Sequence, residues 1–123
     1  MRCWVKPYSR RRNLRLRIQD ALDAIDRAQC FTEGLEGSTW HAEQRTFWAV
    51  VAQFQIIGEV CGLIPKEDRT RHPKVPWDQI RGMRNVIVHE YFRIDEDLVW
   101  MSIVNDLEPL AEVLRSIADD LVD

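Results

Sequence analysis

The chain has 123 residues, of which 46% are hydrophobic and 30% are charged, with only five glycines and five prolines. This profile is typical of one globular domain that buries a core without needing a disulfide or structural metal, and it excludes a fibrous or disordered chain. The net charge of −3 is uneven: residues 1–17 hold seven of the 17 basic side chains and no acid, leaving −10 for the rest. So acidic a body excludes a general nucleic-acid surface. The basic segment could attract phosphate, but charge runs of this kind are more often a solvated helix start or a tail. We expect a basic N-terminal extension over residues 1–12 and one helical domain over residues 13–123.

The cysteines and the apolar runs bear on the compartment. Cys3, Cys30 and Cys61 are far apart, and the chain does not start with the apolar stretch of a signal peptide. Glu59 interrupts the longest apolar run, which falls short of the roughly 20 residues needed to span a bilayer. We therefore expect a cytoplasmic protein with reduced thiols and no membrane association.

Two amphipathic helices are expected in the first half of the chain. Apolar residues recur at three- and four-residue steps over residues 13–31 and again over about 40–63. Two glycines and several hydroxyl residues lie between these segments and predict a loop. Ser38 or Thr39 is the expected N-cap of the second helix.

A long loop and a third helix should follow. The stretch that begins at Pro65 is rich in proline and charge, which favours an exposed connection. Pro76 can then open a third helix. Its expected buried stripe consists of Ile80, Met83 and Ile87.

The third helix should end between His89 and Ile94, and Asp95 can cap a fourth helix that runs to Leu121. Pro109 predicts a kink or a break within that fourth helix. The predicted fold is therefore an all-α, antiparallel bundle of four or five helices, with the second and fourth helices longest. A helical domain of this size often completes its core by dimerising, and we expect an interface near the second and third helices.

The densest group of functional side chains is Arg84, Asn85, His89 and Tyr91. At about 100° per residue, Asn85 and His89 share one helix face, whereas Arg84 and His89 diverge by about 140°. One chain therefore presents Arg84 and His89 poorly to a single ligand, unless the helix ends near His89 or a second copy supplies the partner.

Paired histidines at a dimer axis could cleave RNA without a metal, because one can accept the 2′-hydroxyl proton and the other can protonate the leaving oxygen. Arg84 would bind the phosphate, and Asn85 would orient the phosphate or the imidazole. A purely structural alternative stays open. In it Arg84 pairs with Glu59, His89 is favoured by the helix dipole, and Tyr91 is a core aromatic.

Other sites have weaker support. His41, His72 and the cysteines lack the spacing of metal ligands, and no glycine-rich phosphate loop is present, so we expect neither metal nor cofactor. Glu59, within an apolar helix, could position Arg84, and Arg81 is a second supporting residue of the same cluster.

At these residues the chain resembles the HEPN superfamily, specifically the HepT-type toxins of HEPN/MNT toxin–antitoxin systems. The family pattern of Arg, four to six residues, His, any residue and Tyr is matched by Arg84-NVIV-His89-Glu90-Tyr91. The segments IIGEV at 56–60, PWDQIRGMRN at 76–85 and HEYFRID at 89–95 also resemble the family's, in order and spacing.

The resemblance implies a homodimer whose cleft is lined by Arg84 and His89 of both chains and which cleaves RNA without a metal. It also implies a nucleotidyltransferase antitoxin partner that transfers AMP from ATP to Tyr91. A second hypothesis is a non-catalytic dimeric scaffold that binds such a nucleotidyltransferase.

Overall fold

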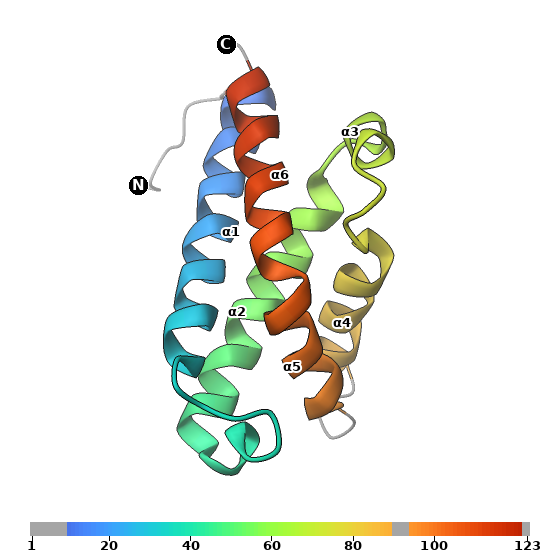
Figure 1. Ribbon diagram of the computed structural model, residues 1–123. Coiled ribbons are helices and arrows are strands. Elements are labelled where there is room, and N and C mark those ends of the chain that lie inside the picture. The colour runs from blue at the N-terminus through green and yellow to red at the C-terminus, as the bar shows by residue number, and fades with distance from the viewer. Residues whose placement is uncertain (1–9, 90–93, 122–123) are drawn as a thin grey trace, which may run out of the picture.

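The computed structural model describes residues 10–89 and 94–121, and the side chains of residues 13–87 and 94–121. Every regular element within these residues is a helix, which confirms the predicted all-α class. Helices α1 (Arg10–Thr32), α2 (Gln44–Leu63) and α6 (Leu107–Asp120) form the long body of the molecule, and α5 (Glu96–Asn105) precedes α6 (Figure 1). Arg15 near the start of α1 donates a hydrogen bond to the carbonyl oxygen of Leu121 after α6, so these two helices are antiparallel neighbours.

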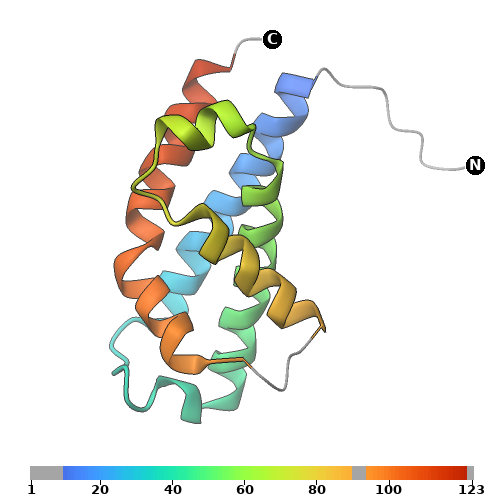
Figure 2. The ribbon, with the colours of Figure 1, turned by 90° about the vertical axis from the view of Figure 1, so that its right-hand side faces the viewer.

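Helix α2 lies at the centre of the packing. It contacts α1 on one side and α4 (Trp77–His89) on the other, and α4 crosses it obliquely (Figure 2). Helices α1, α2, α4 and α6 all contribute fully buried apolar side chains to one core. Among these side chains are Ile18, Ile25, Phe54, Ile57, Ile80, Leu110 and Leu114. Burial of this continuous apolar surface is the main term that stabilises the bundle.

The sequence predicted that no segment is long and apolar enough to span a membrane. By length and composition alone, that prediction is wrong. Helix α2 has 20 residues and a mean hydropathy of 1.3 in its most apolar window, so it passes that test. In the structure it is the core helix of the bundle, packed between α1 and α4, and core helices of soluble proteins pass the same test.

The helix starts differ from those expected in the first half of the chain. Helix α1 begins at Arg10 rather than Asn13, and a short 3₁₀ helix, η1 (Trp40–Ala42), precedes α2. The N-cap of α2 is Glu43, whose side chain accepts a hydrogen bond from the backbone N–H of Thr46 at 3.1 Å. Neither Ser38 nor Thr39 therefore caps α2, because the 3₁₀ helix at Trp40–Ala42 occupies the expected first turn of that helix.

A short helix, α3 (Lys66–Arg71), occupies part of the expected loop. It has acidic residues in its first turn and basic residues in its last. Charges placed in this way interact favourably with the helix dipole and stabilise the helix. None of its residues is buried, so no apolar periodicity marked it in the sequence.

The fourth predicted helix is divided into α5 and α6 at Asp106, which confirms the expected break. Pro109 lies in the first turn of α6, where its missing N–H would have no helical partner in any case. Asp95 caps α5 as predicted, accepting from the backbone N–H groups of Asp97 and Leu98 at 3.0 and 3.1 Å. Because of the break, the longest helices are α1 and α2 rather than the second and fourth.

The contact between α2 and α4 is closest at Gly58. A Cβ atom at this position would lie 2.6 Å from the Cβ of Arg84, which is too short for a real contact, and 3.1 Å from the carbonyl oxygen of Ile80, which is unusually tight. Glycine is thus required here for the two helix backbones to approach. At Gly82 on α4, by contrast, a Cβ would meet no atom within 4 Å.

The two glycines should respond oppositely to alanine. Gly58→Ala should lower the free energy of unfolding by about 1–3 kcal/mol, since the added methyl overpacks the helix contact. Gly82→Ala should raise it by about 0.5–1 kcal/mol, since alanine restricts the unfolded chain and favours the helix. Urea denaturation of both variants beside the parent measures this, and a Gly58→Ala protein as stable as the parent would contradict the packing described.

Candidate functional site

The polar residues of α4 face a hollow between α4 and α2. Arg81, Arg84 and Asn85 follow at three- and four-residue steps, so they share one helix face. The hollow has a volume of about 520 Å³. From α2 it is lined by Gly58, Glu59, Gly62 and Leu63, and from α4 by Asp78, Arg81, Gly82, Arg84 and Asn85.

Arg84 is the residue of this face that packs most closely on α2. It is half-buried, and the Cβ of its side chain lies against the bare backbone of Gly58. Its Nε is inaccessible to solvent and has no hydrogen-bond partner among the described residues. A buried guanidinium N–H without an acceptor is costly, and no described residue offsets that cost.

Glu59 does not pair with Arg84, so that part of the structural alternative is wrong for the described residues. The Oε1 atom of Glu59 lies 3.2 Å from Nη2 of Arg17 on α1. Arg17 also lies 3.8 Å from Asp20, by its Nε atom. Helix α1 therefore compensates the Glu59 charge, and the guanidinium of Arg84 keeps its own positive charge facing the hollow.

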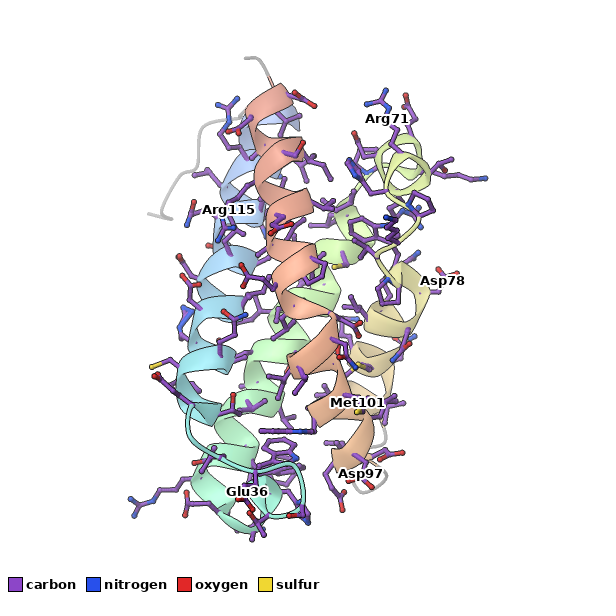
Figure 3. The ribbon with its side chains drawn as sticks, viewed as in Figure 1. Glu36, Arg71, Asp78, Asp97, Met101 and Arg115 are labelled. Carbon is purple, nitrogen blue, oxygen red and sulfur yellow. The ribbon has the colours of Figure 1, made fainter. Side chains whose placement is uncertain are left out.

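Arg81 lies one turn before Asn85. Its Nη1 is 3.8 Å from the carboxylate of Asp78, whose side chain is 98% exposed and points away from the bundle at the start of α4 (Figure 3). An ion pair this exposed is weak.

Burial raises the pKa of the nearby Cys61 thiol to about 12, with the charge of Arg81 opposing the shift. That thiol is protonated at neutral pH and cannot act as a nucleophile.

His89 is the last residue of α4, one turn beyond the exposed Asn85. By Ile94 the chain is no longer helical, which agrees with the expected end of this helix. The side chain of His89 and all of Tyr91 lie outside the described residues. Their proposed roles therefore stay predictions.

The opposite side of α4 behaves as its apolar pattern predicted. Ile80, Met83 and Ile87 are all buried. A second hollow of about 330 Å³, mostly apolar, lies between α4 and α5 and is lined in part by Met83, Val86, Ile87 and Leu98. Helix α4 thus separates a charged hollow from an apolar one.

The glycines that shape the charged hollow and the partner of Glu59 were not predicted from the sequence. Gly58 and Gly62 are one turn apart on α2, and this four-residue spacing could have indicated a helix face without side chains. No sequence signal marked Arg17 as the partner of Glu59, because 42 residues separate them. Within residues 10–89 and 94–121, no group of three or more His, Cys, Asp or Glu side chains is placed to hold a metal ion.

Known proteins resemble this chain over most of its length. The chain is 39% identical over 69 residues to Putative RNase TTE0752 of Caldanaerobacter subterraneus, a match that covers 56% of this chain and 62% of that protein. It is 29% identical over 93 residues to Probable ribonuclease HepT of Thermococcus cleftensis, covering 76% and 84% of the two chains. It is 27% identical over 111 residues to Putative RNase MJ1216 of Methanocaldococcus jannaschii, covering 90% and 92%. No solved structure matches the chain.

The family comparison covers the whole site. Residues 21–117 match the family model described as Ribonuclease HepT-like, a span that includes the hollow and the Arg84 to Tyr91 motif. The helical bundle, the sequence motif and this match together show that the chain belongs to the Ribonuclease HepT-like family of the HEPN superfamily.

Proposed function

We propose that this protein is a metal-independent endoribonuclease of the cytoplasm, with Arg84, Asn85 and His89 as its catalytic residues. The observation that carries the proposal is the side chain of Arg84, which packs by its Cβ against Gly58 and lines an open hollow, and whose buried Nε lacks an acceptor among the described residues. Relatives named as ribonucleases support the same reaction class.

The reaction needs a base and an acid on opposite sides of one phosphate. One His89 removes the proton of the ribose 2′-hydroxyl, whose oxygen attacks the adjacent phosphorus, and a second His89 protonates the departing 5′-oxygen. The products are a 2′,3′-cyclic phosphate and a 5′-hydroxyl end. Arg84 neutralises the charge that grows on the phosphate oxygens, and Asn85 orients the phosphate.

Because this scheme uses two histidines, it requires two chains. Exposed apolar surface favours a dimer through α4 and α5 rather than through α2 and α4. On α5, Leu98, Met101 and Val104 follow one another at three-residue steps and are 40%, 53% and 59% exposed, and Leu98 also lines the apolar hollow beside α4. Met101 projects from α5 at the surface (Figure 3). Contiguous exposed apolar side chains of this kind are typical of protein interfaces.

Solution scattering should show a dimer at micromolar concentration. Changing Met101 and Val104 together to Lys should give a folded monomer without ribonuclease activity, because two charges cannot be buried at the interface. Leu16→Lys on α1, at a residue that is 51% exposed, is the matched control and should stay dimeric. A monomeric parent protein would remove the basis of the composite site.

Arg84→Ala and His89→Ala should each lower RNA cleavage by at least about 100-fold, because each removes a group that acts in the transition state. Their melting temperatures should stay close to the parent's, as expected for residues that add little to the apolar core. Cleavage of a labelled RNA measures the activity, and EDTA should not inhibit the parent. Inhibition by EDTA would contradict the metal-free mechanism, and unfolding of both variants would favour a structural role.

We also propose that the protein is the toxin of a toxin–antitoxin pair and that a nucleotidyltransferase antitoxin modifies Tyr91. The phenol oxygen of Tyr91 attacks the α-phosphorus of ATP, so that a phosphodiester forms and pyrophosphate leaves. The AMP adds a bulky negative group two residues from His89, which blocks the cleft and repels RNA phosphate.

Incubation with the cognate nucleotidyltransferase, Mg²⁺ and ATP should add at least one AMP unit to Tyr91, as measured by mass spectrometry of peptides. Tyr91→Phe should remain toxic and resist neutralisation, because it keeps the ring and lacks the nucleophilic oxygen. AMP found only at other residues would reject this control mechanism and leave the ribonuclease proposal standing.

A second candidate function is a non-catalytic dimer that binds the nucleotidyltransferase. The net charge of −10 outside residues 1–17 favours it, since an acidic body is a poor surface for RNA. Expressing the parent and His89→Ala without the partner separates the two functions. Equal growth and intact RNA in both cultures would support the scaffold.

A further inference from the structure

Two glycines of the charged hollow have no role in the packing of the chain itself. A Cβ at Gly62 would meet only Nε of Arg81, at an ordinary 3.7 Å, and a Cβ at Gly82 would meet nothing within 4 Å. Neither glycine has a positive φ; among the described residues only Gly34 does. Glycine weakens a helix relative to alanine, so both positions lower stability without a steric or backbone requirement. Their effect is to keep the hollow open.

The hollow also presents positive charge, which among its lining residues is offset only by the weak, exposed pair of Arg81 with Asp78 at 3.8 Å. Arg81 and Arg84 both line it, and two guanidinium groups supply ten N–H donors in the fork geometry that suits phosphate. The acid on the facing helix, Glu59, is paired with Arg17 at 3.2 Å and so does not cancel them. The volume of about 520 Å³ lies within the range of sites that hold a small ligand.

The position of the hollow along α4 connects it to the proposed catalytic centre. Arg81, Asn85 and His89 recur at four-residue steps, and eight residues of helix span about 12 Å. Arg84 lies between the two ends of this row. A strand of RNA whose cleaved phosphate lies at the composite site of the two chains can therefore continue along α4 towards Arg81.

We propose that this hollow binds the nucleotide next to the cleaved phosphate, and that Arg81 holds the phosphate of that neighbouring nucleotide. The inference rests on the proposed ribonuclease function and assigns it a substrate-binding subsite. Arg81 is thus a positioning residue, which binds substrate away from the reacting atoms. Gly62 and Gly82 leave the space that the nucleotide fills.

Binding of an uncleavable RNA tests whether the charge of Arg81 contacts a phosphate. The probe is a fluorescent single-stranded RNA with 2′-O-methyl groups throughout, which lacks the attacking hydroxyl. Arg81→Ala should reduce the slope of log affinity against log salt by about 0.7, the value for one phosphate contact on a single strand. Arg81→Lys should keep the slope. Arg71→Ala is the matched control, because Arg71 forms a comparable pair with Asp68 at 3.5 Å on α3, away from the hollow (Figure 3).

Substitutions that fill the hollow test whether the nucleotide occupies it. Gly62→Leu should weaken binding of the same RNA by about tenfold, whereas Gly62→Ala, whose methyl makes only an ordinary contact, should bind within about twofold of the parent. Circular dichroism and melting curves confirm that both variants fold. In cleavage assays Arg81→Ala should raise KM by about tenfold with little change in kcat, unlike Arg84→Ala, which should lower kcat.

The outcomes separate the subsite from the catalytic proposal. Unchanged affinity, KM and salt slope in Arg81→Ala and Gly62→Leu, with a parent that cleaves RNA, would overturn the subsite alone. Arg81-dependent binding by a parent that cleaves no RNA would support the subsite and overturn the ribonuclease. A parent that does not bind the RNA at all would overturn both.

Discussion

The close approach of α2 and α4 at Gly58 is the contact on which the rest of the site depends. Because Gly58 has no side chain, the backbone of α4 crosses α2 at a distance that leaves no room for one methyl group. This crossing fixes the Cβ of Arg84 and, through the helix, the positions of Arg81 and Asn85. A rigid helix carries its side chains together, so a larger residue at position 58 would displace the whole polar face.

The second constraint is the distribution of charge among three helices. An acid on α2 next to two arginines on α4 would ordinarily form the nearest ion pair and neutralise them. Here α1 supplies Arg17, which lies 3.2 Å from Glu59, so the acid is compensated from the side away from α4. The positive charge of Arg84 therefore remains directed at the hollow, and that of Arg81 is offset only by its weak, exposed pair with Asp78, in a protein whose body is strongly acidic. A local positive site within an acidic body restricts where RNA phosphate can bind.

Helix α4 takes part both in the proposed binding of RNA and in the proposed dimer contact, because its two faces meet different surroundings. One face carries Arg81, Arg84 and Asn85 into the charged hollow, and the other contributes Met83 and Ile87 to the apolar hollow beside α5. On our proposals the first face binds RNA and the second leads to the surface of α5 that contacts another chain. An apolar contact that holds two copies of α4 together would also fix the relative position of their motifs.

The sequence by itself determined the helical class, the buried stripe of Ile80, Met83 and Ile87, the cap at Asp95 and the break before α6, because each depends on residues within a few turns of one another. The same local information placed Arg84 and Asn85 on a helix within a family motif. It missed α3, which buries no apolar side chain, and it set the start of α2 too early, because η1 occupies the expected first turn. Only the tertiary structure decided that Glu59 pairs with Arg17, that Gly58 admits Arg84, and that Gly62 opens a hollow beneath Arg81. These relations join residues far apart in the chain, and they follow from which helix faces meet and at what distance, a choice that the periodicity of a single helix does not contain.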